Sequence, residues 1–489
     1  MQHAASNYFP VICRLSGVTI PSVNALPSSL GLACWMSLLG CTRATLPADK
    51  PELPPRDAVR PGFVGVAGPQ LLLDGQPYRF VGANLWYGAY LGAGGELGDV
   101  ERLRAELDLL KSLGVANLRV MGASEAGPMK KSIKPAFRGP TPDYNEELLR
   151  GLDVLLSEMA QRDMKAVIYL NNFWEWSGGM GTYLSWVNGG EFVDLGDPEK
   201  PWPAYPLFTM KFYESEPANA LYRDYVRALL GRTNSVTGAA YADDATIMAW
   251  QLANEPRPGS DARPGHNVLP AFYRWIDETA GFIKSLDPHH LVSTGNEGLA
   301  GCADHDPCFE AAHATPNVDY LTFHIWPKNW GWLLDEDMPG TIEATLANAT
   351  RYMARHIEHA TRLDKPIVLE EFGLSRDGGS LEPGSPTTYR DRFCQLVFDS
   401  IERDIQRGGP FIGSNVWSWG GQGRAARPDG QWRAGDTAYT GDPPQEPQGL
   451  NSIFDVDAST LARLRAHSQA LAAAPIHTPA LVPEAARSP

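Results

Sequence analysis

The sequence is poor in positive charge. Its 489 residues carry 42 Lys and Arg against 57 Asp and Glu, which gives a net charge of −15. A protein that binds nucleic acid needs a basic surface to neutralise phosphates, so this balance argues against nucleic acid as a partner. Hydrophobic residues make up 43% and charged residues 20% of the chain, proportions typical of a soluble globular protein with a full core.

Cysteine is also scarce, and three of the six cysteines fall in the first 41 residues. Cys302 and Cys308 bracket a short polar loop, and we expect them to form a disulfide in an oxidising compartment. Their spacing also suits a metal pair, but no second Cys or His pair stands near enough to complete a site. We therefore predict no metal and no organic cofactor. Cys394 lies in a helical pattern and is expected in the core.

The chain has no apolar run long enough to cross a bilayer. The run SSLGLACWMSLLGC (28–41) suits the hydrophobic region of an export signal. It ends in LLGC, which resembles the lipobox of bacterial lipoproteins and implies lipidation of Cys41; the alternative is an ordinary cleaved signal. We predict a leader over 1–41, a Pro-rich linker over 42–60, and an exported protein, either secreted or a periplasmic or outer-membrane lipoprotein whose only membrane contact is the lipid.

Strand and helix patterns alternate through the rest of the chain. Residues 63–86 read as a hairpin with an Asp-Gly turn that runs into a strand. Eight strand-like runs follow one another at 78–84, 115–122, 165–172, 246–255, 290–298, 319–326, 366–373 and 413–419. Amphipathic helical segments lie at 99–113, 144–162, 218–233, 270–286, 341–362, 387–407 and 458–472. This order predicts a (β/α)8 TIM barrel over 61–474, with an N-terminal hairpin and long strand-to-helix loops.

A doubly wound open sheet is the rival fold, but it usually carries a Gly-rich phosphate turn after its first strand. GANLWYG is not such a turn, and we interpret GGMG (178–181) and GGQG (420–423) as loop glycines. The tail over 475–489 has a disordered composition. No heptad or extended apolar face indicates more than a monomer.

The predicted strands end in carboxylates, amides, one Arg, one His and many indoles. No Ser, Cys or Lys with an activating partner stands there, which disfavours acyl transfer and Schiff-base chemistry. Indole rings stack on the apolar face of a sugar, whereas a single Trp is more often a core residue. Eight tryptophans lie at or just after strand ends: 86, 174, 176, 326, 330, 332, 417 and 419. An acidic, Trp-lined rim of this kind indicates a neutral polysaccharide as the ligand.

Glu255 and Glu371 end the fourth and seventh predicted strands. Glycoside hydrolysis needs two such carboxyl groups, one to protonate the leaving oxygen and the other to attack or to activate water. WQLANEPR (250–257) and IVLEEFGLS (367–375) resemble the acid/base and nucleophile strands of glycoside hydrolase family 5, whose members are retaining (β/α)8 enzymes. NSVTGAAYADDATIMAWQLANEPR, VDYLTFHIWPKNWGW, SNVWSWGGQGR and GDPPQEPQGLNSIF are similar to segments of its bacterial β-mannanases.

The resemblance covers residues 60 to 470. It implies a retaining endo-β-1,4-mannanase that acts on mannan, glucomannan, galactomannan or mannooligosaccharides. It makes Glu255 the general acid/base and Glu371 the nucleophile, with Asn254 on the sugar 2-OH and Arg119 holding the nucleophile ionised. Trp326 stands where many members have a tyrosine that donates to the nucleophile. The further substrate-contacting positions that the resemblance implies are His324, Trp417, Arg257, Glu297, Trp86, Asn172 and Trp174.

Glu370 and Glu371 are adjacent, and successive strand residues point to opposite faces, so we expect only one of them at the barrel mouth. The family motif selects Glu371, which leaves Glu370 facing the helices or a supporting partner. We also expect Arg119 to lower the pKa of Glu371, and a drier setting to raise that of Glu255.

Three alternatives remain open. An exo-acting β-mannosidase would share the scaffold, with the long segment 173–217 as the wall that closes one end of the site. A β-1,4-glucanase would differ only in its preference at the −1 sugar. A non-catalytic glycan-binding lipoprotein with a decayed barrel is disfavoured because both glutamates, Arg119, Asn254 and His324 are present.

Overall fold

The structure, a computed structural model, describes residues 60–260 and 268–476. The predicted leader with Cys41, the linker except Arg60, and the tail from residue 477 lie outside the described residues. No helix in the described ranges is both long enough and apolar enough to cross a membrane.

Eight parallel strands form the central sheet, in the spatial order β8-β7-β6-β5-β4-β11-β10-β9. A bridge between Ser293 and Tyr320 joins the two ends, so the sheet closes into a barrel. The (β/α)8 prediction is therefore confirmed. Seven of the strands fall within their predicted runs, and β11 begins two residues before the predicted run 413–419. The strands are β4 (Phe80–Asn84), β5 (Val115–Met121), β6 (Lys165–Tyr169), β7 (Ile247–Gln251), β8 (Leu291–Ser293), β9 (Leu321–Ile325), β10 (Ile367–Phe372) and β11 (Phe411–Val416).

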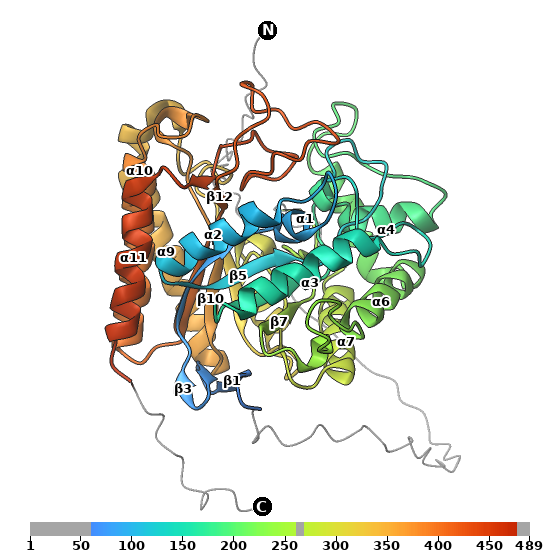
Figure 1. The fold of residues 1–489 in the computed structure, drawn as a ribbon, viewed down its shortest axis with the longest axis horizontal. Helices are drawn as coiled ribbons and strands as arrows, with labels where there is room; N and C mark the ends of the chain where they lie inside the picture. The colour runs from blue at the N-terminus through green and yellow to red at the C-terminus, as the bar shows by residue number, and fades with distance from the viewer. Residues whose placement is uncertain (1–59, 261–267, 477–489) are drawn as a thin grey trace, which may run out of the picture. The chain divides into compact units, whose positions relative to one another are not determined.

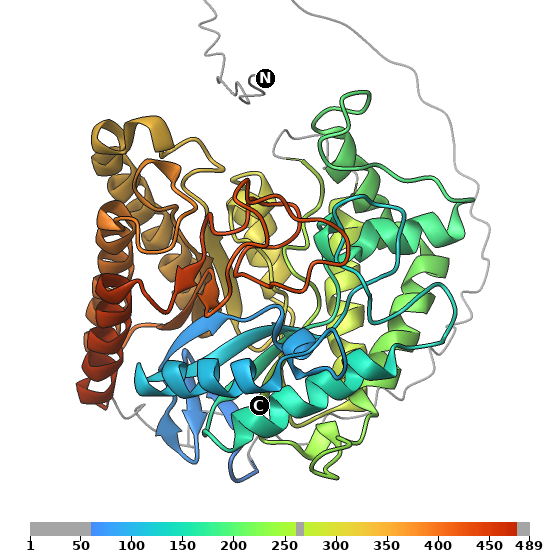
Figure 2. The same cartoon turned by 45° about the horizontal axis from the view of Figure 1, so that its top comes forward.

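Helices surround the strands (Figures 1 and 2). The seven predicted helices are present as α2 (Val100–Ser112), α3 (Glu146–Ala160), α6 (Glu216–Leu230), α7 (Leu269–Leu286), α9 (Met338–Leu363), α10 (Thr388–Gln406) and α11 (Ala458–Ala473). Their apolar faces pack on the outside of the sheet, as the helical spacing of those residues requires.

Four shorter helices were not predicted: α1 (Gly88–Gly92), α4 (Gly179–Val187), α5 (Ala204–Thr209) and α8 (Asp306–His313). The interpretation of GGMG as loop glycines was wrong for Gly179 to Gly181, which begin α4. It was also wrong for Gly420 and Gly421, which belong to the short strand β12 (Trp419–Gly421). Helices this short give too little periodicity to be recognised, and α1 and α4 also have glycine in their first turn.

The N-terminal hairpin closes the end of the barrel at which the strands begin. It consists of β1 (Val64–Ala67), β2 (Gln70–Leu73) and β3 (Gln76–Pro77), and the predicted Asp-Gly turn, Asp74 and Gly75, joins β2 to β3 with positive φ at both residues. Val64 and Leu71 pack with inward-facing residues near the strand starts, among them Phe80 and Met248. Figure 1 shows β1 and β3 at the opposite end of the barrel from β12.

The segment between β11 and α11 is long and carries β12 and β13 (Ile453–Phe454), which pair with each other. The buried Asp442 carboxylate holds it in place, since it accepts hydrogen bonds from the backbone N–H groups of Gly449, Asn451 and Ser452 at 2.8, 2.8 and 3.3 Å. The site described next is therefore bordered by a firmly held segment after β11.

Candidate active site

The two predicted catalytic carboxyl groups meet at the C-terminal ends of the strands. Glu371 lies in β10, and Glu255 follows β7 in a left-handed conformation with φ of 49°. Single side-chain atoms of Glu255, Glu371 and His324 all lie within 4.8 Å of one another, and all three residues are buried. Elements more than 100 residues apart thus place two carboxylates and an imidazole around one point, as expected from the sequence.

β10 carries a bulge at Glu370. Leu369 pairs with Phe323 of β9, and the next pair is Glu371 with His324, so Glu370 is an extra residue without a partner on β9. Both glutamates consequently point into the barrel, whereas strand alternation predicts opposite faces. Of the two alternatives expected for Glu370, the helices are wrong and a supporting partner is confirmed, because Glu370 accepts hydrogen bonds from Gln251 and from the Tyr320 hydroxyl inside the barrel.

Arg119, in β5, organises the floor of the site. Its Nη1 donates to Glu371 Oε1 and, at 3.2 Å, to Asn84 Oδ1, while Nη2 donates to Asn254 Oδ1 at 2.7 Å. Its Nε donates to Gln251 Oε1 at 2.8 Å. The fully buried guanidinium therefore fixes both the proposed nucleophile and the amide expected at the sugar 2-OH. The roles of Gln251 and Asn84 around this arginine were not predicted.

Glu255 is held by three side chains from two strand ends, those of β6 and β9. His324 Nδ1 lies 2.7 Å from Glu255 Oε1, the Trp326 indole N–H donates to the same oxygen at 3.3 Å, and the Trp174 indole N–H donates to Oε2. His324 Nδ1 is also 3.4 Å from Glu371 Oε2, so the imidazole faces both carboxylates. The residue that replaces the usual tyrosine, Trp326, thus contacts Glu255 and makes no such bond to Glu371.

The pKa directions of the two carboxyls are the reverse of those expected. Burial raises the pKa of Glu371 well above its usual value, Arg119 only partly offsets this, and the Glu255 charge raises it further. Burial also opposes ionisation of Glu255, but His324, Arg257 and Trp174 outweigh it and lower its pKa to about 2. Burial lowers the pKa of His324 to about 4. Glu255 accepts more hydrogen bonds than Glu371, and this cannot be seen in the sequence. The expected directions of the two pKa shifts were wrong for this reason.

Glu255, His324 and Glu371 are also, within the described ranges, the one group of three side chains with metal-ligand chemistry. Arg119 and the indole of Trp174 already donate to these carboxylates. A guanidinium beside the nucleophile disfavours a further cation at the same point, so the group is arranged for proton transfer and nucleophilic attack.

Arg257 and Glu297, which the family resemblance places on the leaving-group side of the site, lie next to Trp174, which it places in the cleft wall. Arg257 forms an ion pair with Glu297, which follows β8, and its guanidinium carbon lies 5.1 Å from the centre of the Trp174 ring. Asn172 uses its amide within the protein: its Oδ1 accepts from the Trp174 backbone N–H at 2.9 Å and from Asn254 Nδ2 at 3.1 Å. The structure therefore makes Asn172 a support for two of its predicted neighbours.

Three of the eight tryptophans at the strand ends are core residues. Trp86, Trp176 and Trp419 are almost fully buried, and the Trp86 indole N–H donates to the Gly441 carbonyl at 2.9 Å. Trp86 is thus an anchor for the segment after β11, which corrects its assignment as a lining residue. Trp174, Trp330 and Trp332 keep partial exposure, and the Trp417 ring packs against Trp326 with centroids 5.8 Å apart.

One further carboxyl of the site was missed. Glu446 lies in the segment after β11, keeps partial surface exposure, and is 3.4 Å from Asn451 Nδ2. Burial, the Asp442 charge and, more weakly, the Glu255 charge raise its pKa to about 8. It belongs to GDPPQEPQG, a stretch whose resemblance to known β-mannanases is the one signal in the sequence that pointed to it.

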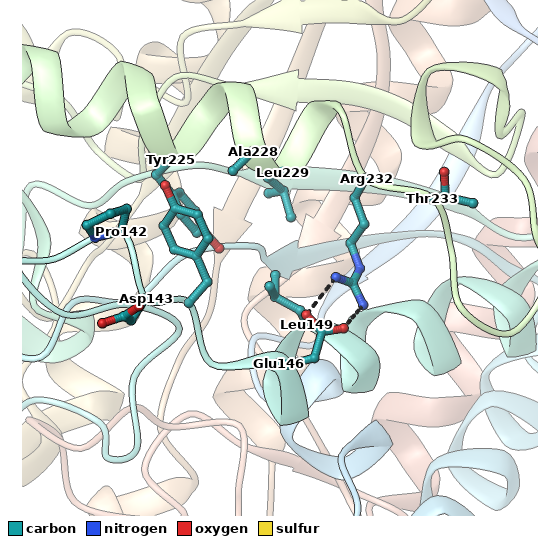
Figure 3. Close-up of a pocket in the computed structure, with 10 residues that line it drawn as sticks. Pro142, Asp143, Glu146, Leu149, Tyr225, Ala228, Leu229, Arg232 and Thr233 are labelled. Carbon is teal, nitrogen blue, oxygen red and sulfur yellow. Dashed lines mark hydrogen bonds and ion pairs between the residues drawn. The ribbon is translucent and has the colours of Figure 1, made fainter.

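A separate cavity of about 470 Å³ lies between α3 and α6 (Figure 3). Tyr144 and Tyr225 line it, and Arg232 and Glu146 form an ion pair across one side. None of the predicted site residues lines this cavity.

The comparisons with known proteins decide the family. The sequence model of the GH family 5 beta-mannosidase-like proteins matches residues 61–475. The chain belongs to glycoside hydrolase family 5. It is 31% identical over 377 residues to the putative mannan endo-1,4-beta-mannosidase 4 of Arabidopsis thaliana, which covers 73% of this chain and 83% of that protein.

Solved structures of this glycoside hydrolase family agree with the fold. The family 5 mannosidase from Rhizomucor miehei is 33% identical, with a TM-score of 0.77, and covers 84% of this chain and 98% of its own. The endo-1,4-beta-mannanase from the same organism is 23% identical with a TM-score of 0.59, which shows the shared barrel. The chain is thus a glycoside hydrolase on a (β/α)8 barrel.

Proposed function

We propose that the protein is a retaining hydrolase of β-mannosidic bonds, with Glu371 as nucleophile and Glu255 as acid/base. The observation that carries this proposal is the placement of the two carboxyl groups, with one oxygen of each and a His324 nitrogen all within 4.8 Å of one another. Retaining enzymes keep these groups about 5–5.5 Å apart, whereas inverting enzymes separate them by about 6.5–9.5 Å to admit a water molecule.

In the first step Glu371 attacks the anomeric carbon while Glu255 protonates the departing glycosidic oxygen. The sugar is then bound to Glu371 as an ester, and the leaving sugar carries the proton. In the second step Glu255 takes a proton from water, whose oxygen displaces Glu371 from the sugar. The first step requires a protonated Glu255 and an ionised Glu371, whereas the raised pKa of Glu371 and the low pKa of Glu255 favour the reverse. One proton must therefore pass from Glu371 to Glu255 before attack begins.

Arg119 favours this proton position, whereas the contact of His324 with Glu255 opposes it. Arg119 stabilises the anionic form of Glu371, and the contact of His324 Nδ1 with both carboxylates couples their charges. Asn254, fixed by Arg119, is placed to bond the sugar 2-OH, the interaction that strengthens as the oxocarbenium-like transition state forms.

The substrate we propose is β-1,4-mannan or its oligosaccharides. Curated relatives from Arabidopsis, rice and tomato with 28–31% identity carry the name mannan endo-1,4-beta-mannosidase. Endo action on internal bonds is accordingly the first candidate mode.

Exo action is the second candidate, and a specific feature favours it. The segment after β11, held by Asp442 and by Trp86, brings Glu446 close enough for its charge to interact with that of Glu255. The 33% identical structure from Rhizomucor miehei is named a mannosidase, in agreement with this mode.

A product time course on linear β-1,4-mannan, run beside cellulose, tests the proposal. A spread of mannooligosaccharides that is absent for Glu371→Ala supports endo action by this pair. Mannose or mannobiose alone from the first time point supports exo action. Release of sugars from cellulose but not from mannan would overturn the proposed substrate, and full activity of Glu371→Ala would overturn the proposed nucleophile.

A further inference from the structure

Cys302 and Cys308 lie side by side, the first in the loop between β8 and α8 and the second in the first turn of α8. Their sulfur atoms are 2.6 Å apart, and both side chains are no more than 2% exposed. Non-bonded carbon atoms pack about 3.5–4.0 Å apart and an S–S bond measures about 2.05 Å, so the two sulfurs are closer than ordinary packing allows. The protein has thus brought two cysteines into near-bonding position inside its core.

The local backbone produces this approach. Cys302 ends a short 3-10 turn (Ala300–Cys302), Cys308 lies in the first turn of α8, and the chain between them reverses through Ala303 and Asp304, both with left-handed φ of 53° and 54°. The backbone N–H of Cys308 donates to His305 at 2.9 Å, and that of His305 donates to Cys302 at 3.1 Å. The reversal is therefore closed by hydrogen bonds that hold the two side chains on the same side.

A metal does not account for the pair. Neither cysteine belongs to a group of three or more metal-type side chains among the described residues. Two sulfurs alone do not make a structural zinc site, which takes four ligands.

The same loop reaches the catalytic centre. Glu297 lies in its first half and forms the ion pair with Arg257, whose guanidinium lies over Trp174. Two residues of α9 hold the loop from outside: the Tyr352 hydroxyl accepts from the Ala300 N–H at 2.9 Å, and His356 Nε2 accepts from the Leu299 N–H at 3.0 Å. The cysteine pair holds the same loop next to α8. We therefore expect the position of Glu297 to depend on the cysteine pair and on the two contacts with α9.

We propose that Cys302 and Cys308 form a disulfide that fixes the β8–α8 loop and thereby positions Glu297 and Arg257 for the leaving-group sugars. The bond forms by exchange with an external disulfide, such as that of an oxidised thiol-disulfide oxidoreductase or of oxidised glutathione. One thiolate attacks the external disulfide and displaces a thiolate from it. The second cysteine then attacks the resulting mixed disulfide, so that two protons and two electrons leave the protein and the partner disulfide becomes two thiols.

Burial raises the pKa of Cys302 well above its usual value, so the folded protein disfavours the attacking thiolate. Exchange therefore takes place before the loop is buried, and the finished bond resists reductants until the protein is partly unfolded. The bond itself is independent of the proposed function, whereas its effect on the leaving-group sugars rests on that function.

Peptide mass mapping of the full chain, produced in an oxidising compartment and denatured in the presence of an alkylating agent, tests the bond. Trypsin releases Ser285–Lys328 as one peptide that contains Cys302, Cys308 and no other cysteine. We expect this peptide unalkylated and about 2 Da lighter than its reduced form, because two hydrogen atoms are lost. Recovery of the peptide with both cysteines alkylated would overturn the proposal.

Kinetics on mannooligosaccharides test the positioning role. We expect Cys302→Ser to raise KM about threefold to tenfold with kcat within about twofold, because the groups that bind the leaving sugars lose their fixed position. Its Tm should fall by about 2–3 °C, the loss expected for a small closed ring in a domain of this size. Cys394→Ser, which changes another buried cysteine on α10, is the matched control and should leave KM unchanged.

An unchanged KM in Cys302→Ser would overturn the positioning role even where the mass map shows the bond. If Cys302→Ser does not fold, the wild-type protein refolded with and without reductant replaces it, and the reduced form should show the same rise in KM. Absence of any activity in the oxidised wild type would count against the proposed function and leave the mass-map result intact.

Discussion

Glu370 and Glu371 are adjacent in sequence, and both point into the barrel because the bulge in β10 leaves Glu370 unpaired on β9. Glu371 faces the sugar-binding end with Arg119 and His324, whereas Glu370 lies among Gln251, Tyr320 and the Nε side of Arg119, at 3.8 Å. The two carboxyls therefore share one guanidinium. We infer from these contacts that Glu371 is the reacting carboxyl group and that Glu370 supports it.

Glu370→Gln should make stability less dependent on pH. Burial raises the pKa of Glu370 to about 7, and Arg119 and Gln251 only partly offset this. The folded protein thus keeps a proton that the unfolded chain releases near pH 4.5, so this group stabilises the fold at low pH and its contribution is lost as pH rises towards 7. The loss amounts to roughly 3 kcal/mol over that window, and glutamine, which resembles the protonated acid, removes it.

Denaturant midpoints at pH 5 and pH 8 measure this effect. The difference between the two midpoints should be smaller in Glu370→Gln than in the wild type, and kcat should stay within about tenfold because Glu371 is untouched. The exposed Glu336→Gln variant is the control and should keep the wild-type difference. An undiminished pH dependence in Glu370→Gln, or loss of activity as complete as in Glu371→Ala, would contradict the supporting role.

Arg119→Lys should lower kcat by about 100-fold or more, since misplacement of reacting groups by about 1 Å has this effect. A lysine provides one point charge, whereas the three nitrogens of the guanidinium together bind four side chains, Glu371, Asn84, Asn254 and Gln251. Steady-state kinetics and Tm measure the outcome, with the largely exposed Arg104→Lys as the control. Wild-type kcat in Arg119→Lys would show that the charge alone suffices.

Glu255→Ala should separate the two chemical steps. On mannan the rate should fall by about 10³-fold, because no group protonates the leaving oxygen. An aryl β-mannoside with an acidic leaving group does not need that proton, so its first step should remain fast and produce a burst of the phenol. Azide, an anionic nucleophile that needs no base, should then speed turnover and give a β-mannosyl azide. Absence of both burst and rescue would place the acid/base elsewhere.

Most of the barrel could be predicted because its strands are continuous apolar runs separated by long amphipathic helices. The short helices α4 and α8 could not, since each is only about two turns long and begins with residues that also suit loops. The bulge at Glu370 could not be predicted for a related reason. Val368 and Leu369 are equally apolar, so no alternation in the sequence marks the point where the period of two is broken.

The strand ends and the family motifs predicted which residues form the site. They did not predict the directions in which the pKa values of Glu255 and Glu371 are shifted. The pKa of Glu255 depends on His324, Arg257 and the indole N–H of Trp174, which come from other parts of the chain.

The positions of Trp86 and Glu446 could not be predicted either: Trp86 was expected to line the cleft and lies in the core, and Glu446 was not expected at the site. Whether a residue near a strand end faces the core or the substrate is decided by the long segment after β11, whose path has no periodic signal.

The most direct test of the central claim is to trap the covalent intermediate. A suitable reagent is a mannosyl fluoride that carries a second fluorine on the carbon next to the anomeric centre. It forms the ester with the enzyme quickly, and water then hydrolyses this ester slowly. After inactivation and proteolysis, tandem mass spectrometry of the peptide that contains Leu369–Phe372 locates the sugar. We expect one sugar on Glu371. A sugar on Glu370, or inactivation without any adduct on this peptide, would contradict the retaining mechanism through Glu371.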